Sequence, residues 1–215
     1  MPLDDLLLSG TNFAELGMYK KAIEEFNLVI QIKPDSADAY NNLGIVYSKV
    51  ELYQEAIEAF KMTIKLVPNN VEAHYNLGVI YGILGMHQEA IEECKNAILL
   101  DPCHIDSHFN LGFAYIKTGD HNEAVKSFTE LVKLAPNHLE AYFHLGIVSA
   151  QLGKFKESIK AFNKVLEFAP DNADAHYNLG LFYLASGNNE KALEEYEILK
   201  KLDPGLAKKL YESIA

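Results

Sequence analysis

Apolar residues along this chain recur at the three- and four-residue spacing of amphipathic helices, with charged and amide side chains between them. Between residues 77 and 98 this spacing gives two consecutive apolar stripes separated by a short polar link. The first stripe contains Leu77, Tyr81 and Leu84, and the second contains Ala90, Ile91, Cys94 and Ile98. The pattern predicts a pair of short helices joined by a turn, and similar pairs follow along the whole chain.

Three kinds of residue recur with a period of 34 residues, the spacing typical of a helical repeat array. The glycine row is Gly10, Gly44, Gly78, Gly112, Gly146 and Gly180. The proline row is Pro34, Pro68, Pro102, Pro136, Pro170 and Pro204. The third row is Ala22, Ala56, Ala90, Ala124, Ser158 and Ala192.

Each row has a physical reason. A glycine inside a helix costs about 1 kcal/mol relative to alanine, so its recurrence implies a close approach of the second helix. The alanine row, near the start of each second helix, is expected to meet the glycine from the other side. The proline after each second helix ends that helix.

Helix starts are also indicated by the sequence. Ser36, Asn70 and Asn172 are expected to cap first helices, each followed by an acidic residue in the first turn. Asp120 with Glu123 resembles a capping box for a second helix.

The segment from His74 to Pro102, HYNLGVIYGILGMHQEAIEECKNAILLDP, resembles the tetratricopeptide repeat (TPR) family. The resemblance implies an all-α fold, a right-handed α-solenoid superhelix of helix–turn–helix units. The expected units are residues 3–36, 37–70, 71–104, 105–138, 139–172 and 173–206. The departures from the family pattern are local. Cys94 stands where phenylalanine is usual, and Ser149 stands where tyrosine is usual. The family's tryptophan is replaced by Tyr40, His74, His108, Tyr142 and His176. The first unit matches least well, because it has Leu6 and Ser9 where the family usually has tryptophan and leucine.

The tail is expected to form a C-terminal capping helix, residues 207–215 continuing from Leu206. Leu206, Leu210, Tyr211 and Ile214 would share one face of that helix. At the other end, Leu3, Leu6, Leu7 and Leu8 crowd the start of the first unit.

Composition narrows the classes of partner. The net charge is −11, and all 19 cationic residues are lysines, so nucleic acid is not an expected partner. The two cysteines form no disulfide framework, and no segment approaches the length of a transmembrane helix. The leucine run near the N-terminus lacks a basic segment and a cleavage pattern, so no leader is expected and the protein is predicted to be cytoplasmic.

The eight histidines raise the possibility of a metal or catalytic site. Equivalent positions in stacked repeats lie too far apart to share a metal ion, and Cys103 beside His104 lacks further ligands. Packing or exposure at the surface is the simpler interpretation. With no phosphate-binding loop and no convergent carboxylate pair in the sequence, we expect no cofactor, no metal and no enzymatic activity.

In the TPR family the first helices line a concave groove that binds extended or helical peptides. An amide row stands two residues before the glycines, and a ring row one residue earlier. These predicted groove residues are Asn42, Asn76, Asn110, His144, Asn178, Tyr75, Phe109, Phe143 and Tyr177. A side-chain amide both donates and accepts, so it suits a peptide backbone. The row resembles the asparagine ladder in the TPR superhelix of O-linked N-acetylglucosamine transferases. Alternatively, asparagine is simply common at this family position, and the rings pack between units.

Acidic residues stand at the second position of every unit: Asp4, Asp38, Glu72, Asp106, Glu140 and Asp174. Two interpretations remain, either stabilisation of the helix dipole or an acidic stripe that prefers a basic ligand. The carboxylate clamp of chaperone adaptors has lysine or arginine where this chain has acids and amides, which argues against binding an EEVD-type tail.

The sequence therefore predicts a non-catalytic adaptor that holds a segment of a partner protein in its concave groove. Two alternatives remain. One is a scaffold that assembles head to tail from copies of itself, and the other is a regulatory subunit of a multiprotein complex.

Overall fold

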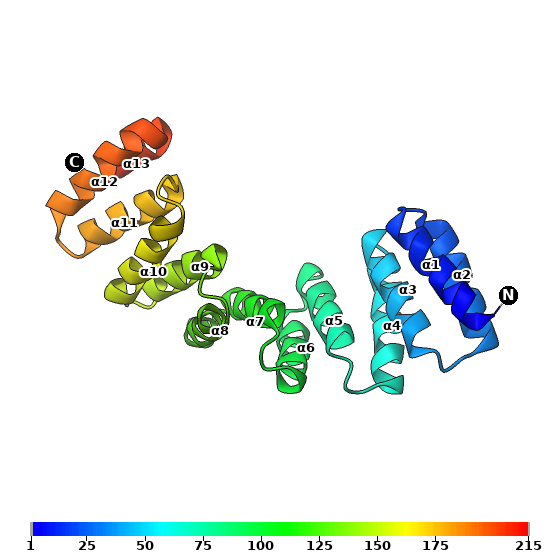
Figure 1. The fold of residues 1–215 in the computed structure, drawn as a ribbon. Helices are drawn as coiled ribbons and strands as arrows, with labels where there is room; N and C mark the ends of the chain where they lie inside the picture. The colour runs from blue at the N-terminus through cyan, green and yellow to red at the C-terminus, as the bar shows by residue number, and fades with distance from the viewer. Residues whose placement is uncertain (1, 215) are drawn as a thin grey trace. The chain divides into compact units, whose positions relative to one another are not determined.

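The computed structural model describes residues 2–214, and its helices follow one another in antiparallel pairs along the chain (Figure 1). No strand occurs between residues 2 and 214, so the all-α prediction is confirmed. The helices are α1 (Leu3–Glu15), α2 (Tyr19–Ile32), α3 (Ala37–Lys49), α4 (Tyr53–Leu66), α5 (Val71–Ile83), α6 (His87–Leu100), α7 (Ile105–Thr118), α8 (His121–Leu134), α9 (Leu139–Gln151), α10 (Phe155–Phe168), α11 (Ala173–Ala185), α12 (Asn189–Leu202) and α13 (Pro204–Ile214).

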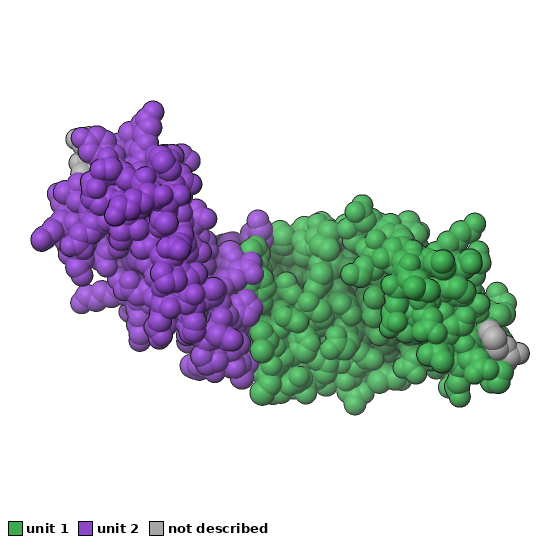
Figure 2. Space-filling view, turned by 45° about the horizontal axis from the view of Figure 1, so that its top comes forward, with its two compact units in different colours: residues 1–114 green, residues 115–215 purple. Residues whose placement is uncertain are grey.

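The chain divides into two compact units, residues 1–114 and 115–215, with the boundary inside α7 (Figure 2). In unit 1 the hairpins α1/α2, α3/α4 and α5/α6 stack in order, because each second helix packs against the first helix of the next hairpin. Unit 2 repeats this arrangement from α8 to α12 and adds α13. Each unit is thus built from neighbour-to-neighbour helix contacts, as in other solenoids.

Within a hairpin, the glycine row meets a phenylalanine of the second helix. A methyl carbon built on Gly44 would lie 2.7 Å from a ring carbon of Phe60, and one on Gly146 would lie 2.6 Å from Phe162. Both rings are completely buried. The collision predicted for this row is correct, but the nearest atoms belong to the ring four residues after the alanine, not to the alanine itself.

Two hairpins depart from this pairing. At Gly78 the opposing residue is Cys94, whose sulfur would lie 3.1 Å from an added methyl carbon, so this contact is looser. At Gly180 the closest side chain is Leu210 of α13, not Tyr196 of the same hairpin. The last glycine is therefore covered from outside its own hairpin.

The N-termini of the first helices are capped by side chains of two kinds. Asn70 and Asn172 accept hydrogen bonds from the backbone amides of Ala73 (2.8 Å) and Ala175 (2.9 Å), as expected. His138 occupies the same position and accepts from the Ala141 amide through Nδ1 at 3.1 Å. Ser36, by contrast, makes no side-chain cap.

The expected capping box of the fourth hairpin does not form. Asp120 makes no side-chain cap. Its carboxylate accepts a hydrogen bond from the Thr118 hydroxyl at 2.7 Å instead. Thr118 thus competes with the helix terminus for the carboxylate.

The turn inside each hairpin requires a left-handed backbone. Gly85 has φ +75° at this place, and Glu51 takes the equivalent place 34 residues earlier with φ 61°. A residue with a Cβ is strained there, whereas glycine is not. Glu51 is the one non-glycine residue with positive φ in the described chain.

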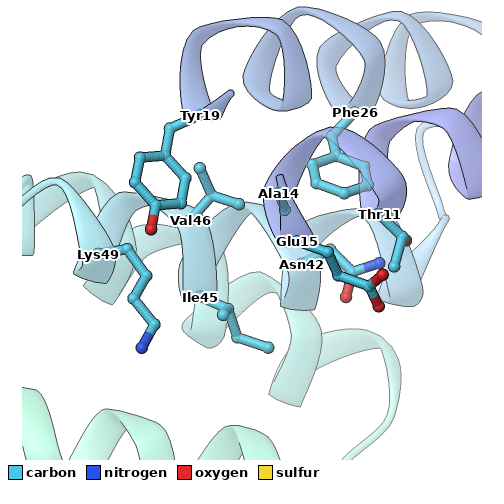
Figure 3. Close-up of a pocket in the computed structure, with 9 residues that line it drawn as sticks. All are labelled: Thr11, Ala14, Glu15, Tyr19, Phe26, Asn42, Ile45, Val46 and Lys49. Carbon is cyan, nitrogen blue, oxygen red and sulfur yellow. The ribbon is translucent and has the colours of Figure 1, made fainter. Parts of the chain in front are cut away.

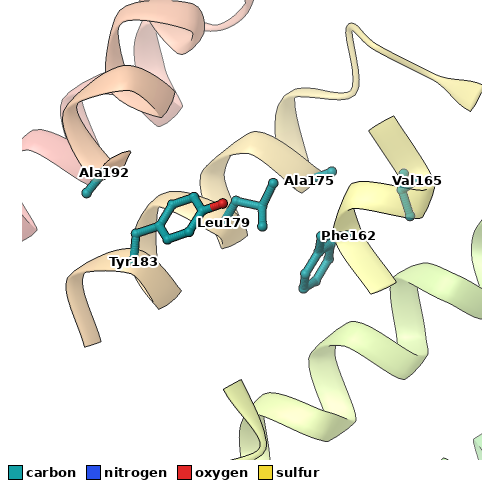
Figure 4. Packing of buried hydrophobic residues seen from close by; sticks show 6 residues of the cluster. All are labelled: Phe162, Val165, Ala175, Leu179, Tyr183 and Ala192. Atoms are coloured by element: carbon teal, nitrogen blue, oxygen red, sulfur yellow. The ribbon is translucent and has the colours of Figure 1, made fainter. Parts of the chain in front are cut away.

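The core of each unit runs between consecutive hairpins. In unit 2, Phe162 and Val165 of α10 pack against Leu179 and Tyr183 of α11, together with Ala175 and Ala192 (Figure 4). In unit 1 the corresponding cluster joins Phe26 of α2 to Leu43 and Val46 of α3.

Helix α13 covers the apolar edge of the last hairpin. Leu210 and Ala207 are buried against Leu199 of α12, and the Tyr211 and Tyr196 rings lie 5.4 Å apart. The helix begins at Pro204, earlier than expected, because Asp203 accepts hydrogen bonds from the next amides, at 2.8 Å from Gly205. The side chain of Ile214 and all of Ala215, both expected in this helix, lie outside the described residues.

Alanine substitutions distinguish glycines that are needed for a close helix contact from a glycine that only lowers helix propensity. Gly44→Ala forces a methyl group into the Phe60 ring, and we expect a loss of about 1–3 kcal/mol in the free energy of unfolding. Gly78→Ala should cost less, since the opposing sulfur leaves more room. Urea unfolding followed by circular dichroism measures both.

Gly82→Ala is the matched control, because Gly82 lies inside α5 with nothing within 4 Å of the added methyl carbon. It should stabilise the protein by up to about 1 kcal/mol through helix propensity alone. Equal effects of Gly44→Ala and Gly82→Ala would show that the ring contact does not constrain the hairpin.

Candidate functional site

The amide and ring rows lie on the first helices of the hairpins, and we call this surface the first-helix face. All nine predicted residues are half-buried, neither in the core nor fully exposed. Asn42, Asn76 and Asn110 belong to unit 1, while His144 and Asn178 belong to unit 2. The structure thus provides two separate segments of the face, each described below.

A pocket of about 260 Å³ opens on the first-helix face of unit 1, between α1 and α3 (Figure 3). Thr11, Glu15 and Asn42 gather at one side of the pocket, and Tyr19 and Lys49 lie at the other. Its remaining lining residues, Ala14, Phe26, Ile45 and Val46, are apolar. The pocket therefore combines the Asn42 amide, the Glu15 carboxylate and the Lys49 ammonium group with an apolar floor.

Sequence reasoning identified Asn42 at this pocket but missed Thr11, Glu15, Tyr19 and Lys49. The first hairpin matches the family pattern least well, so no groove residue was predicted in it. Thr11 stands one repeat before Ile45 and Glu15 one repeat before Lys49, and this register was the available signal.

In unit 1 Tyr75 joins the ring row to the amide row. The Tyr75 and His104 rings lie 5.0 Å apart. The pKa of Tyr75 is raised, first by burial and next by the Asp106 carboxylate, while a hydrogen bond with the Asn110 side chain opposes the shift. Asn110 is thus already engaged by the neighbouring hairpin.

His104 extends this cluster. Its Nδ1 accepts a hydrogen bond from the Ser107 amide at 3.2 Å, and its Nε2 lies 3.6 Å from the Glu72 carboxylate. The imidazole thus caps α7 and faces an exposed acid of the preceding hairpin.

In unit 2 the corresponding residues, His144 and Phe143, pack against aromatic rings of neighbouring helices. The His144 ring stacks on Phe128 with centroids 5.7 Å apart, and burial lowers its pKa despite Glu140 at 3.9 Å. Phe143 makes an edge contact with Phe162 at 5.4 Å. The His144 ring thus packs between consecutive hairpins, and the Phe143 ring packs within its own hairpin.

Asn178 and Tyr177 are likewise engaged within unit 2. The Asn178 side chain donates to the Asp174 carbonyl at 2.7 Å, so part of its amide is used by its own helix. Tyr177 packs against the cluster of Leu199 and Leu210. Asn42, by contrast, lines the pocket between α1 and α3.

The acidic row stands in the first turns of the first helices and is exposed in every repeat. This position favours the helix dipole. Glu72 and Glu140 also lie beside His104 and His144. The row is thus accessible to solvent, as a surface that attracts a basic ligand requires.

Two buried histidines form ion pairs with glutamates of the second helix. His74 Nδ1 lies 2.6 Å from the Glu93 carboxylate, and its Nε2 lies 3.1 Å from the Pro68 carbonyl. His176 repeats this arrangement with Glu195 at 2.6 Å and Pro170 at 2.8 Å. The hydrogen bond with Glu93 is the main cause that raises the pKa of His74, against the effect of burial. In the second pair, burial raises the pKa of Glu195, and the hydrogen bond from His176 opposes it.

The residues at these two positions differ between repeats, with Leu6 and Glu25 in the first and His108 and Ser127 in the fourth. Where the ring position holds tyrosine, as in Tyr40 and Tyr142, the partner position holds Ala59 and Ala161. In the third and sixth repeats the histidine provides a hydrogen-bond partner for a half-buried glutamate. The pairs are parts of the packing between helices.

Neither a metal centre nor a membrane span emerges from the described residues. No group of three histidine, cysteine or acidic side chains between residues 2 and 214 has the arrangement that holds a metal ion. In the same range, no helix has the length and apolar character needed to cross a bilayer. Cys94 is buried with a thiol pKa raised to about 12, chiefly by burial, whereas Cys103 is exposed.

Family models match the chain along most of its length. A model described as TPR repeat matches residues 10–50 and 148–187. Two models described as tetratricopeptide repeat match residues 37–70 and 71–102, and residues 105–138 and 173–206. Among curated proteins no match is found.

Several solved structures have the same fold. YrrB, described as a TPR protein with an unusual peptide-binding site, is 28% identical with a TM-score of 0.79, covering 87% of this chain and 97% of that one. The MamA protein is 26% identical with a TM-score of 0.75, covering 81% of this chain and 96% of that one. PilF of Pseudomonas aeruginosa, at 18% identity and a TM-score of 0.76, covers 99% of this chain and 97% of its own, and it supports the fold alone.

The His74–Glu93 pair predicts a pH dependence of stability. Because the pKa of His74 in the folded chain is raised, the pair stabilises fully below the ordinary histidine value of about 6.5. This stabilisation is lost as the pH rises through the higher pKa of the folded state. The double variant His74→Tyr with Glu93→Ala copies Tyr40 and Ala59 of the preceding repeat and removes the titrating pair.

Unfolding free energies of both proteins between about pH 6 and pH 9 test this prediction. The stability of the wild type relative to the variant should fall across that range. A constant difference would mean that the pair does not titrate in the folded chain.

Proposed function

We propose, from the premise that the chain belongs to the tetratricopeptide repeat family, that it is a non-catalytic adaptor which binds a segment of a partner protein along its first-helix face. The observation that carries the proposal is the pocket between α1 and α3, where Asn42 stands beside the apolar side chains of Ile45 and Val46. An amide at the rim bonds a peptide backbone, and the apolar floor takes a side chain.

The spacing of the amides supports an extended ligand. Helices that pack about 8–10 Å apart would space successive asparagines by about that distance. An extended peptide advances about 3.3–3.6 Å per residue, so each asparagine would serve every third residue. Asn42 and Asn76 stand on consecutive first helices of unit 1 and are the natural pair for this contact.

Charge favours a basic ligand. Asp38, Glu72 and Asp106 are exposed at the starts of the first helices of unit 1. Exposed acids attract lysine- or arginine-bearing segments and speed their association. The peptide-binding site for which the YrrB structure is described adds support, since that protein spans nearly the same repeats.

The double variant Asn42→Ala with Asn76→Ala tests the proposal. A peptide selected from a displayed library on the wild-type protein serves as the ligand, and calorimetry measures its affinity. Each lost hydrogen bond is worth about 1 kcal/mol, so the double variant should bind roughly tenfold or more weakly.

Asn69→Ala with Asn163→Ala is the control, because both asparagines are exposed and neither stands in the amide row. Circular dichroism verifies that each variant stays folded. Unchanged affinity of the Asn42/Asn76 variant for every selected peptide would refute binding by the amide row.

A second candidate is self-association through the first hairpin. Leu8 and Leu16 are 60% and 71% exposed, although Leu6 is buried and Leu3 and Leu7 are half-buried. Exposed leucines near one end of a repeat array favour head-to-tail contact between copies. In this version a copy of the chain, not a different protein, is the partner.

Light scattering across a concentration series separates the two candidates. Self-association predicts a mass that grows with concentration and falls back to that of one chain in Leu8→Ser with Leu16→Ser. A mass of one chain at all concentrations would leave the peptide adaptor as the better account.

A further inference from the structure

The second helices of unit 2 flank a groove on a different surface from the first-helix face. The groove encloses about 610 Å³ between α8 and α10, with Tyr142 and Leu145 of α9 on its floor. We call it the basic groove, because its lining includes Lys133, Lys154, Lys160 and Lys164. Against these four lysines the lining contains one acid, Glu157. This local excess of positive charge contrasts with a net charge of −11 for the whole chain.

The same groove occurs in unit 1 with different chemistry. Between α2 and α4 lies a groove of about 590 Å³, and nine of its ten lining residues stand 102 positions, three repeats of 34, before a lining residue of the basic groove. Tyr40 and Leu43 take the places of Tyr142 and Leu145. Where the basic groove has Lys160 and Lys164, the groove of unit 1 has Glu58 and Met62. The fold therefore tolerates either charge at these positions, and the lysines are not required for packing.

The floor of the basic groove also contains an unsatisfied polar group. Ser149 lines the groove and is 1% exposed, and its hydroxyl makes no hydrogen bond with any described residue. The equivalent position is tyrosine in four other repeats, namely Tyr47, Tyr81, Tyr115 and Tyr183. A buried hydroxyl without a partner costs free energy, which a polar atom of an occupant would recover after rotation of the side chain.

The lysines are held at the rim by weak contacts. Lys133 pairs with Glu130 at 2.6 Å and Lys164 with Glu167 at 2.7 Å. The Lys164 side chain is 41% exposed, and the other three are more than half exposed. Lys154 donates to Asn122 at 3.4 Å. Exposed pairs of this kind contribute little to stability, so the ammonium groups are available to exchange partners.

We propose that the basic groove binds an acidic amphipathic helix of a partner protein. The lining side chains recur at helical spacing on both walls, as with Lys160 and Lys164 on α10, and a groove between helices accepts the ridge of a third. Apolar residues of the incoming helix lie on Tyr142 and Leu145, and its carboxylates meet the lysines on either side. The inference goes beyond the proposed function, because it concerns another surface and a partner of opposite charge.

Two designed peptides of about 18 residues, long enough to form helices, are the probes. Both carry leucine at i, i+4 and i+7, and one has glutamate where the other has lysine. Fluorescence anisotropy on the full chain measures their affinities at about 0.05 M and about 0.5 M salt. The glutamate peptide should bind, more weakly at high salt, and the lysine peptide should not bind at this groove.

The variant Lys160→Glu with Lys164→Met copies Glu58 and Met62 and should weaken binding of the glutamate peptide at least about tenfold. Lys156→Glu with Lys126→Met changes the net charge equally at exposed lysines outside the lining, and it should retain binding. Ser149→Tyr places the ring found in other repeats on the floor and should also weaken binding without unfolding the chain, which circular dichroism verifies.

Several results would overturn the inference. One is failure of the glutamate peptide to bind the wild type, and another is wild-type affinity in both the Lys160/Lys164 variant and Ser149→Tyr. Loss of the glutamate peptide in Asn42→Ala with Asn76→Ala, with binding retained in the lysine variant, would assign it to the first-helix face. Since the proposed function is tested with those asparagine variants and different peptides, either proposal can fail alone.

Discussion

The hairpins depend on a close contact between a glycine of the first helix and a buried side chain, which at Gly10, Gly44 and Gly146 is a phenylalanine ring of the second helix. Phe60 against Gly44 and Phe162 against Gly146 leave no room for a methyl group. Because the ring is held there, the two helices keep one distance and one register, and the rest of the hairpin surface is free to vary. Where the ring is absent, another side chain takes its place: Cys94 in the third hairpin, and Leu210 of α13 in the last.

The repeat period made the helices and their order predictable, since glycine, alanine and proline recur for steric reasons that do not depend on context. The same period did not reveal which atoms meet. Gly44 and Gly146 face phenylalanine rings and not the alanine row, and the Asp203 carboxylate accepts the hydrogen bonds that allow α13 to begin at Pro204. Such details depend on the choice of side-chain rotamer and on hydrogen bonds that form after the helices have packed. His138 as a helix cap and Glu51 in a left-handed turn are further examples, because neither residue type is usual in its position.

The candidate site was predictable only as a surface. The amides of Asn42, Asn110 and Asn178 occupy equivalent positions, yet one lines a pocket, one contacts Tyr75, and one is bound to its own helix. Equivalence in sequence therefore does not give equivalence in chemistry, because each amide has different neighbours one repeat away. The basic groove was also absent from the sequence prediction, although four lysines between residues 154 and 164 in an acidic chain were a visible signal.

The substitution of a thiol for a ring at Cys94 has a consequence for reactivity. The side chain is completely buried, and its pKa of about 12 keeps it protonated, so it is a poor nucleophile while the hairpin is closed. Modification of this sulfur requires that α5 and α6 separate, a local opening that need not involve the other hairpins. Cys103, exposed a few residues later, reacts without any such opening. The rate at which a thiol reagent modifies Cys94 would therefore report the local opening of one hairpin. The rate at Cys103 would report the reactivity of the reagent without that opening.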